Sequence, residues 1–262
     1  MSDERVELGH AIISFVEPHP GYELAWNRWY ERDHLIAAGT GAPFTMALQR
    51  WLATRRHKAV RVPHDNPIAQ PPERGTFLAA MWIQKDHLVD QQAWVAEQMK
   101  MLAEQDRNFD QRDVLSTASW DYLGGALRDP DGVPPELALD RRYEGIVLVW
   151  LECRSGTSPQ ALSEALRAQV LPSILDQSPI AQALCFTPLP KADWWPKAAP
   201  EVPGVGTRVL VACFVECDPL DAWSEHFAEL TSDLEAEGLC EVLLVAPFVA
   251  SVPGVDPDLD EL

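Results

Sequence analysis

The sequence predicts an α+β fold made of two tandem ferredoxin-like repeats, each with the element order β-α-β-β-α-β. Three observations predict it. Apolar strand-like runs and helical runs follow one another in that order, the order begins again after a polar linker, and Leu35 aligns with Leu171 at an offset of 136 residues. We expect repeat 1 at 1–124, a linker at 125–142, and repeat 2 with an acidic tail at 143–262.

Breakers and apolar runs set the elements of the first half. Pro18 and Gly21 precede a helical stretch, Gly41 and Pro43 end it, and Asp86 is the expected N-cap of a second helix. A Pro-rich loop is expected at 53–75. The predicted elements are strands at 11–16, 44–52, 76–84 and 114–122, with helices at 22–38 and 88–105.

The second half repeats this pattern, with a Pro-rich loop at 188–206. Pro43 aligns with Pro179 at the same offset, so an internal duplication best explains the sequence. Each sheet, with helices on one side only, leaves its other face uncovered. We therefore expect the two antiparallel sheets to pack face to face as an intrachain, pseudo-dimeric α+β barrel. The predicted strands are 145–152, 180–187, 209–216 and 241–250, with helices at 158–176 and after Asp218-Pro219.

Composition argues against several classes of partner. The chain has 21 Lys and Arg against 40 Asp and Glu, a net charge of -19, so nucleic acid and anionic membranes should be repelled. Its five Cys form no CxxC pair, and neither a signal peptide nor an apolar run of membrane-spanning length is visible. These features predict a cytoplasmic protein without membrane contact. The ten Trp either fill a large core or line a pocket for flat apolar ligands.

The helix predicted at 22–38 carries the best candidates for chemistry. Helical spacing puts Asp33 on a stripe with Trp26 and Trp29, while Tyr30 and His34, four residues apart, share a flank. Such a cluster of titratable groups is typical of general acid/base catalysis. In the competing interpretation, Asp33 binds a backbone amide or an Arg, and His34 is an ordinary helix-flank histidine.

The second repeat lacks these titratable side chains. The aligned positions hold apolar or neutral residues, and the polar residues Ser116 and Ser119 of the fourth strand correspond to Leu244 and Pro247. We therefore expect one working cavity, in repeat 1. The replacements in the helix are Ala165 for Trp29, Leu166 for Tyr30, Gln169 for Asp33 and Val170 for His34.

The pattern Trp29-Tyr30-x-x-x-His34-Leu35, followed by a Gly/Pro break and a strand ending in Arg50-Trp51, resembles the EthD-like proteins of the dimeric α+β barrel superfamily. The resemblance covers 8–124 by motif and 144–254 by pattern. It implies that His34 faces a cavity and moves protons on a small, often aromatic or lactone-like substrate. Members include cofactor-free monooxygenases, isomerases, cyclases, dehydratases and haem enzymes, and several are homodimers.

These observations predict a cofactor-independent enzyme in which His34, with Tyr30 and Asp33, performs acid/base chemistry on a small hydrophobic metabolite. The expected class is an isomerase, cyclase, dehydratase or decarboxylase acting on an aromatic, lactone or polyketide-like compound. Candidate substrate-binding residues are Trp29, Arg50, Trp51, Ser116 and Ser119. We expect a monomer, as an internal pseudo-dimer, or a homodimer. The alternatives are a non-catalytic binding protein for an apolar small molecule and, third, a cofactor-free monooxygenase or a scaffold subunit.

Other motifs add little chemistry. No HxH or HExxH spacing and no Gly-rich phosphate loop is present, so no metal is expected. No cofactor is expected either, although haem stays open because one axial His suffices. The basic cluster Arg55, Arg56, His57, Lys58 and Arg61 is either a clamp for a substrate anion or, as we favour, a solvated charge run. The Trp194-Trp195 loop is either a lid or a packed surface loop.

Overall fold

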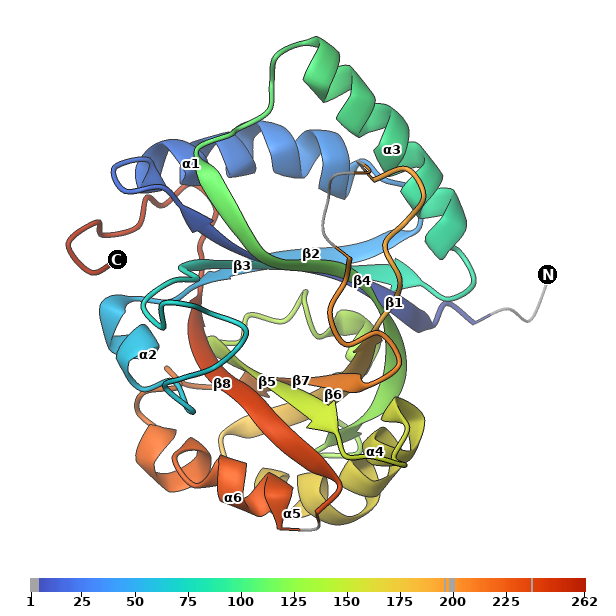
Figure 1. The fold of residues 1–262 in the computed structure, drawn as a ribbon, viewed down its shortest axis with the longest axis vertical. Helices are drawn as coiled ribbons and strands as arrows, with labels where there is room; N and C mark the ends of the chain where they lie inside the picture. Colours follow the sequence, from blue (N-terminus) through green and yellow to red (C-terminus); the bar gives the residue numbers. More distant parts are fainter. Residues whose placement is uncertain (1–4, 196, 198–200, 237) are drawn as a thin grey trace.

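The computed structural model describes residues 5–195, 197, 201–236 and 238–262. Eight antiparallel strands form a closed barrel in the order β1-β3-β2-β8-β5-β7-β6-β4. Figure 1 shows α1 and α3 covering one outer face of the barrel and α4, α5 and α6 covering the opposite face. The predicted α+β class is therefore confirmed. In the described part of the chain, no helix has the length and apolar character needed to cross a membrane.

The elements of the first half follow the predicted order. The first helical stretch starts as an α-helix, continues through two π-helical segments, and is followed by the second strand. The bounds are β1 Leu8–Pro18, α1 Glu23–Trp29, η1 Tyr30–His34, η2 Ile36–Thr40, β2 Thr45–Leu52, α2 Arg55–Ala59, β3 Phe77–Gln84, α3 Leu88–Glu104 and β4 Arg112–Leu127.

The second half follows the same order after a short 3-10 turn. Its bounds are η3 Pro135–Leu137, β5 Gly145–Cys153, α4 Pro159–Ala165, η4 Leu166–Val170, α5 Leu171–Leu175, β6 Ile180–Pro188, β7 Arg208–Val215, η5 Trp223–Phe227, α6 Leu230–Glu235 and β8 Cys240–Ala250.

The two halves share their strand order. Half one contributes β4-β1-β3-β2 and half two β8-β5-β7-β6. The π-helical segments η1 and η4 also correspond, since Leu166 follows Tyr30 at the offset of 136 residues seen in the sequence. The duplication itself stays a prediction, which this correspondence supports. Because η4 has Leu166 and Val170 where η1 has Tyr30 and His34, the π-helical turn is a property of both halves and not of a catalytic site.

The two sheets join at their edges, so they form one continuous barrel and not a sandwich of separate layers. At one seam β4 pairs with β6 from Trp120–Pro188 to Leu127–Gln182. At the other, β2 pairs with β8 only at Trp51–Ala250 and Leu52–Val249. Closure leaves the inner faces of both halves facing one another, where they must fill the interior with side chains.

Aromatic side chains from both halves fill the barrel. The Phe15 ring lies 5.8 Å from Trp150 and 5.6 Å from Phe248. Trp51 and Trp82 both approach Phe214 at 6.4 Å. All of these rings are fully buried. Several of the ten Trp therefore fill the core of the barrel.

Local structure departs from the predictions at four places, the first of which is the short helix α2 within the loop expected at 53–75. Asp86 is not an N-cap: its φ is 66°, and His87 holds the cap position of α3. Strand β4 runs to Leu127, beyond a register shift between Tyr122 and Gly124, so the first residues of the predicted linker at 125–142 belong to a strand. The helix predicted at 22–38 changes from α-helical to π-helical geometry in η1 and η2. Different residues therefore share its inner face than α-helical spacing predicts.

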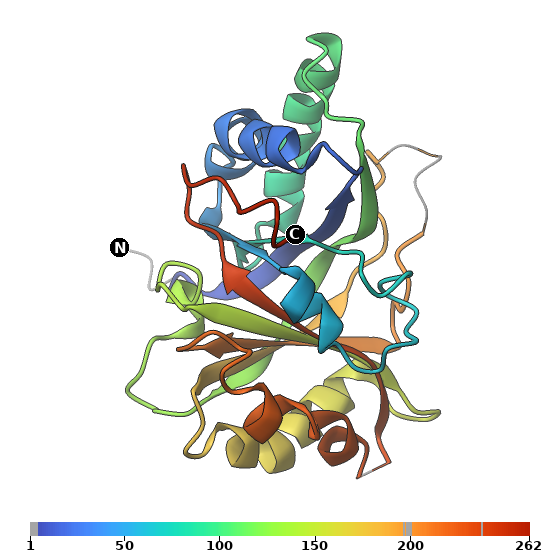
Figure 2. The same ribbon diagram turned by 90° about the vertical axis from the view of Figure 1, so that its left-hand side faces the viewer.

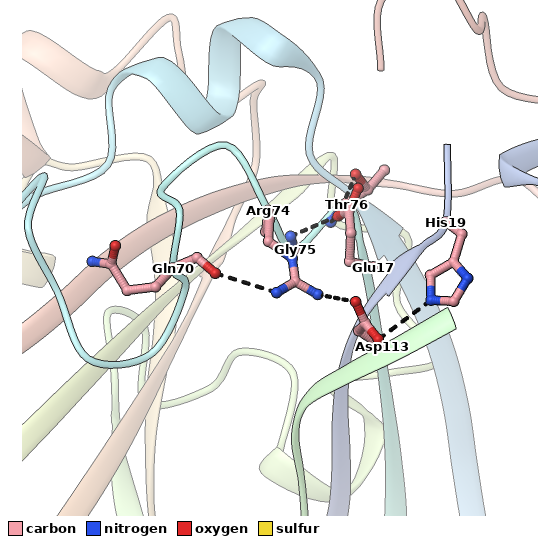
Figure 3. A network of polar contacts seen from close by, with 7 residues as sticks. All are labelled: Glu17, His19, Gln70, Arg74, Gly75, Thr76 and Asp113. Carbon is pink, nitrogen blue, oxygen red and sulfur yellow. Dashed lines mark hydrogen bonds and ion pairs between the residues drawn. The ribbon is translucent and has the colours of Figure 1, made fainter. Parts of the chain in front are cut away.

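The loop at 53–75 crosses from half one to half two. Val62 exchanges two backbone hydrogen bonds with Val245 of β8, at 3.3 and 2.6 Å. At its far end, Glu17 of β1 accepts hydrogen bonds from the backbone N–H groups of Gly75 and Thr76 at 2.7 and 2.8 Å, as Figure 3 shows. Arg74 also pairs with Asp113 of β4. The loop is therefore fixed to both halves.

Three members of the basic cluster, all within this loop, are buried. Arg61 donates to the backbone carbonyls of Pro72, Arg74 and Gly75 and lies 5.4 Å from the Phe15 and Phe248 rings. His57 contacts Asp218, and Lys58 donates to Thr76. Only Arg55 and Arg56 are exposed. Our preferred interpretation of a solvated charge run is therefore wrong for the buried three, which serve as internal hydrogen-bond donors.

Segment 251–262 crosses in the opposite direction, from β8 back over half one, and lies beside α1 in Figures 1 and 2. The Ser251 N–H donates to the Arg50 carbonyl at 3.0 Å, and Arg28 of α1 pairs with Asp256 at 2.5 Å. Leu262 packs against Trp26. Each half is thus held by a segment of the other.

We expect Arg61→Met to lower the free energy of unfolding by about 2–4 kcal/mol, because it removes the donor to three carbonyls at a site where only 2% of Arg61 is exposed. Chemical denaturation measures the change. The exposed Arg56→Met is the matched control and should stay within about 0.5 kcal/mol of the parent. Equal stability of the two variants would contradict the proposed role of Arg61.

Candidate functional site

A cavity of about 420 Å³ lies between the outer face of the half-one sheet and the helices that cover it. Its lining residues thus place it outside the barrel. The helices on this side of the sheet are α1 and α3, as Figure 1 shows. Its floor comes from residues of neighbouring strands, and its roof comes from the four helical elements α1, η1, η2 and α3. The floor residues are Ile12, Ser14 and Val16 of β1 and Val114, Thr117 and Ser119 of β4.

The π-helical turn η1 brings Trp29, Tyr30 and His34 together on the cavity wall. In a π-helix the backbone hydrogen bond joins residues i and i+5, so Trp29 and His34 lie nearly one above the other. Their rings stack at 4.7 Å with an interplanar angle of 22°. The Tyr30 ring lies 5.2 Å from the His34 ring. Of the predicted catalytic residues, Tyr30 and His34 therefore share one cavity.

The His34 imidazole is held neutral. Burial, reinforced by the Arg112 cation and opposed by Asp33, lowers the pKa of His34 to about 4. Its Nδ1 atom is buried and finds no hydrogen-bond partner in the part of the chain that the structure describes. Near pH 7 the imidazole is therefore neutral, and one of its two nitrogens can accept a proton.

Tyr30 stays protonated. Burial raises the pKa of its phenol, while the Arg50 and Arg112 cations oppose that shift. The Arg50 guanidinium lies 4.7 Å from the Tyr30 ring centre and is held by hydrogen bonds of 2.8 Å to Glu31 and to Asn27. Tyr30 can therefore donate a hydrogen bond, and Arg50 supports the ring without lining the cavity.

Asp33 does not line the cavity. It forms a two-point ion pair with Arg107, whose hydrogen bond lowers the pKa of the Asp33 carboxyl despite partial burial. The carboxylate is ionised and already paired, as the competing interpretation of the sequence holds. The α-helical stripe expected for Trp26, Trp29 and Asp33 fails because the helix changes to π geometry at Tyr30.

The predicted substrate-binding residues divide into two groups. Trp29 and Ser119 line the cavity, and Ser119 accepts a hydrogen bond from Gln92 at 2.9 Å. Trp51 is fully buried inside the barrel, and neither Arg50 nor Ser116 is part of the lining. Side chains alternate along a strand, so Ser116 and Ser119 cannot share a face without a bulge.

Sequence reasoning missed several residues of the wall. Thr117, hydrogen-bonded to Ser14 at 2.7 Å, occupies the floor. Arg112, from the start of β4, lines the cavity and lies 5.1 Å from the Trp29 ring. Gln91 of α3 is also part of the wall. An isolated Arg before an alternating strand is a weak signal, and nothing in the sequence links it to His34.

The Trp194-Trp195 pair forms part of the cavity wall. Its rings contact each other edge to face at 6.1 Å, and Trp194 is 36% exposed. The loop therefore contributes aromatic surface to the cavity.

Among the described residues, no group of three or more His, Cys, Asp or Glu is placed to hold a metal ion. The polar groups that reach the cavity are an imidazole, a phenol, a guanidinium, hydroxyls and amides. This set suits proton transfer and hydrogen bonding to an organic ligand.

Solved structures of similar fold span nearly the whole chain. An anthrone oxidase-like protein matches with a TM-score of 0.54 at 10% identity, covering 97% of each chain. A proposed monooxygenase from Fusobacterium nucleatum subsp. nucleatum has a TM-score of 0.51 at 7% identity, covering 96% of this chain and 95% of that one. A proposed chlorite dismutase has a TM-score of 0.50 at 11% identity, covering 95% of this chain and 97% of that one.

These likenesses show the dimeric α+β barrel fold that the sequence predicts, whereas an EthD-like relationship stays a prediction. No protein-family model matches the chain, and no curated protein matches its sequence.

We expect Arg112→Gln to raise the pKa of His34 from about 4, because the variant removes a cation that disfavours the imidazolium. Titration of ¹³C-labelled histidine by NMR measures the pKa, and His34→Gln identifies the signal. Arg55→Gln, at an exposed position, should leave the pKa unchanged. A lower pKa in Arg112→Gln would contradict this electrostatic account.

Proposed function

We propose that the protein is a cofactor-independent enzyme in which His34 takes and returns a proton on a small hydrophobic metabolite. The observation that carries the proposal is the neutral, buried imidazole with an unpartnered Nδ1, placed beside a protonated phenol on an aromatic cavity wall. An organic ligand with a flat ring fits these surroundings. Aromatic, lactone and polyketide-like compounds are the proposed substrates.

The chemistry follows from the two groups. His34 removes a proton from a carbon next to a carbonyl, the C–H electron pair becomes part of an enolate, and the imidazole becomes an imidazolium. Tyr30 donates a hydrogen bond to the enolate oxygen. The imidazolium, acidic because of its burial, returns the proton to another carbon. The balanced outcome is an isomerisation, and loss of a leaving group from the enolate would instead give a dehydration.

Asp33 and Arg50 act indirectly in this proposal. Asp33 favours the His34 cation electrostatically from its pair with Arg107, and Arg50 fixes the Tyr30 ring. The cavity is built mainly from half one, with Trp194 and Trp195 added from half two of the same chain, and the barrel that supports it is closed within the chain. A pseudo-dimeric monomer therefore suffices for the proposed activity, although a homodimer is compatible with it.

A second candidate is cofactor-free oxidation by dioxygen. It is favoured by the fold shared with an anthrone oxidase-like protein and a proposed monooxygenase. The first step is the same proton removal by His34. The carbanion then reacts with O₂, the CH₂ group becomes C=O, and the second oxygen atom leaves as water. Oxygen consumption equal to product formation distinguishes this route from isomerisation.

The third candidate is a binding protein without turnover. It shares the aromatic cavity but assigns no chemistry to His34. Ligand binding that survives His34→Ala, together with the absence of proton exchange or oxygen consumption in the parent protein, would favour it.

Proton transfer can be tested before the natural substrate is known. A panel of aryl ketones, anthrones and enol lactones is incubated in D₂O, and deuterium entry at carbon is followed by NMR. We expect exchange catalysed by the parent protein to fall by about 10²–10⁴-fold in His34→Ala and His34→Gln. His64→Ala, at an exposed position, is the matched control. Full exchange in both His34 variants would overturn the proposal.

A further inference from the structure

We infer that the cavity selects an elongated aromatic acid, whose anionic group binds Arg112 at one end and whose hydrogen-bond donor binds the Gln91 amide oxygen at the other. The inference deepens the proposed function by naming its substrate class. It rests on that function only for the reaction of His34 with the central part of the ligand. Four observations support it: an unpaired cation, an unpaired buried acceptor, their separation and the aromatic walls between them.

Arg112 is the unpaired cation. Its guanidinium is half-buried, donates to the Phe109 carbonyl and lies over the Trp29 ring. The nearby Arg50 and Arg107 pair with Glu31 and Asp33, whereas Arg112 forms no ion pair with any residue that the structure describes, although the Asp110 carboxylate acts on it electrostatically. A guanidinium presents five N–H donors in a planar fork, so most of its donors remain for a ligand. A carboxylate fits that fork with two parallel hydrogen bonds.

Gln91 is the unpaired acceptor. Its side chain is 0% exposed, and its amide NH₂ group donates only to the Met81 sulfur at 3.4 Å. The amide oxygen is buried and has no partner among the described residues. An unsatisfied buried carbonyl costs about 1–3 kcal/mol. A ligand hydroxyl or N–H at this point would satisfy it, whereas the neighbouring Gln92 is already bonded to Ser119.

The strand register separates the two groups. Gln91 contacts Met81, which lies opposite Ile12 of β1, and Ile12 lies opposite Ser119 of β4. Arg112 lies opposite Pro18, six residues further along β1. At about 3.3 Å per residue, the two rows are roughly 20 Å apart between backbones. Both side chains line the same cavity, so a ligand touching both must be elongated.

Aromatic side chains and the proposed catalytic groups lie along this path. Trp29, Tyr30 and the Trp194-Trp195 pair supply ring surfaces, and His34 is part of the same wall. Flat rings bury well against such walls. A ligand anchored at both ends would therefore pass the imidazole with its central part.

Binding of an anion at Arg112 would also raise the pKa of His34. Arg112 lowers the pKa of His34, so a carboxylate paired with Arg112 offsets that effect and moves the pKa up from about 4. A base works best when its pKa lies near the working pH. The anionic end of the substrate would thereby strengthen the base that acts on its central part.

Binding of three synthetic probes tests the inference. The probes are 4′-hydroxybiphenyl-4-carboxylate, its methyl ester, which lacks the charge, and biphenyl-4-carboxylate, which lacks the hydroxyl. Calorimetry gives each Kd. We expect the parent protein to bind the hydroxy acid at least about tenfold more tightly than the ester, and several-fold more tightly than the acid without the hydroxyl.

Each preference is assigned to one residue by a variant. Arg112→Gln should lose the preference for the acid over the ester and keep the preference for the hydroxyl. Gln91→Met should lose the preference for the hydroxyl and keep the preference for the acid over the ester. Arg55→Gln and Gln111→Met, at exposed positions, are the matched controls and should keep both preferences. A folded Arg112→Gln variant that still prefers the acid would overturn the role of Arg112, and a folded Gln91→Met variant that still prefers the hydroxyl would overturn that of Gln91.

The parent protein alone can also overturn the inference. Equal Kd values for the acid and the ester would do so without any variant, even if Arg112→Gln fails to fold. The same three probes are then measured with His34→Ala, which should retain both preferences. Retained preferences without proton exchange in the parent would overturn the proposed function and leave this inference standing. Proton exchange by a parent protein that shows no preference for the acid over the ester would overturn this inference and leave the proposed function standing.

Discussion

The aromatic filling of the barrel decides where this protein can bind a ligand. Phe15, Trp51, Trp150 and Phe214 come from both halves and meet inside the closed sheet, where they are fully buried. A barrel of eight strands is just wide enough for side chains to fill it, and here they do. The cavity that holds His34 accordingly lies outside the sheet, between strands and covering helices. The fold thereby separates its core from its candidate site, so the aromatic wall around His34 can vary without disturbing barrel closure.

The two outer faces of the barrel use the same architecture differently. In half two, Leu166 of η4 is buried in an apolar cluster with Leu162 and Phe227. In half one the corresponding segment, η1, carries Tyr30 and His34 toward a cavity. Burying an imidazole and a guanidinium costs free energy that leucine and valine do not cost. Two ion pairs outside the cavity, Arg50–Glu31 and Arg107–Asp33, therefore stabilise this polar face.

The sequence was sufficient for the element order, because strand and helix periodicities differ and Pro and Gly mark most boundaries. It also grouped Trp29, Tyr30 and His34, because they lie close together in one predicted helix. Ser119 was added as a polar residue of the predicted fourth strand. It could not show the change to π geometry at Tyr30, which depends on packing and not on helix propensity. That change decides that Trp29 stacks on His34 while Asp33 turns to Arg107.

The remaining parts of the site depend on contacts between distant residues. Asp33 and Arg107 are 74 positions apart, and Arg50 reaches Asn27 across 23. No local pattern encodes such pairs, so the sequence could not tell a paired carboxylate from a catalytic one. Arg112 was missed for the same reason. Its importance comes from what it lacks, a carboxylate partner among the described residues, and this becomes visible only when its neighbours are paired with others.

Charge within the cavity and charge on the whole chain have opposite signs. A net charge of -19 opposes the approach of anions, but at physiological salt the Debye length is about 8 Å, so this repulsion is largely screened. Inside the cavity, Arg112 is half-buried and screened far less. An acid that reaches the cavity therefore meets a local cation whose field exceeds that of the distant acidic surface. Ligand choice depends on that desolvated guanidinium, and the surface charge affects mainly the rate of arrival.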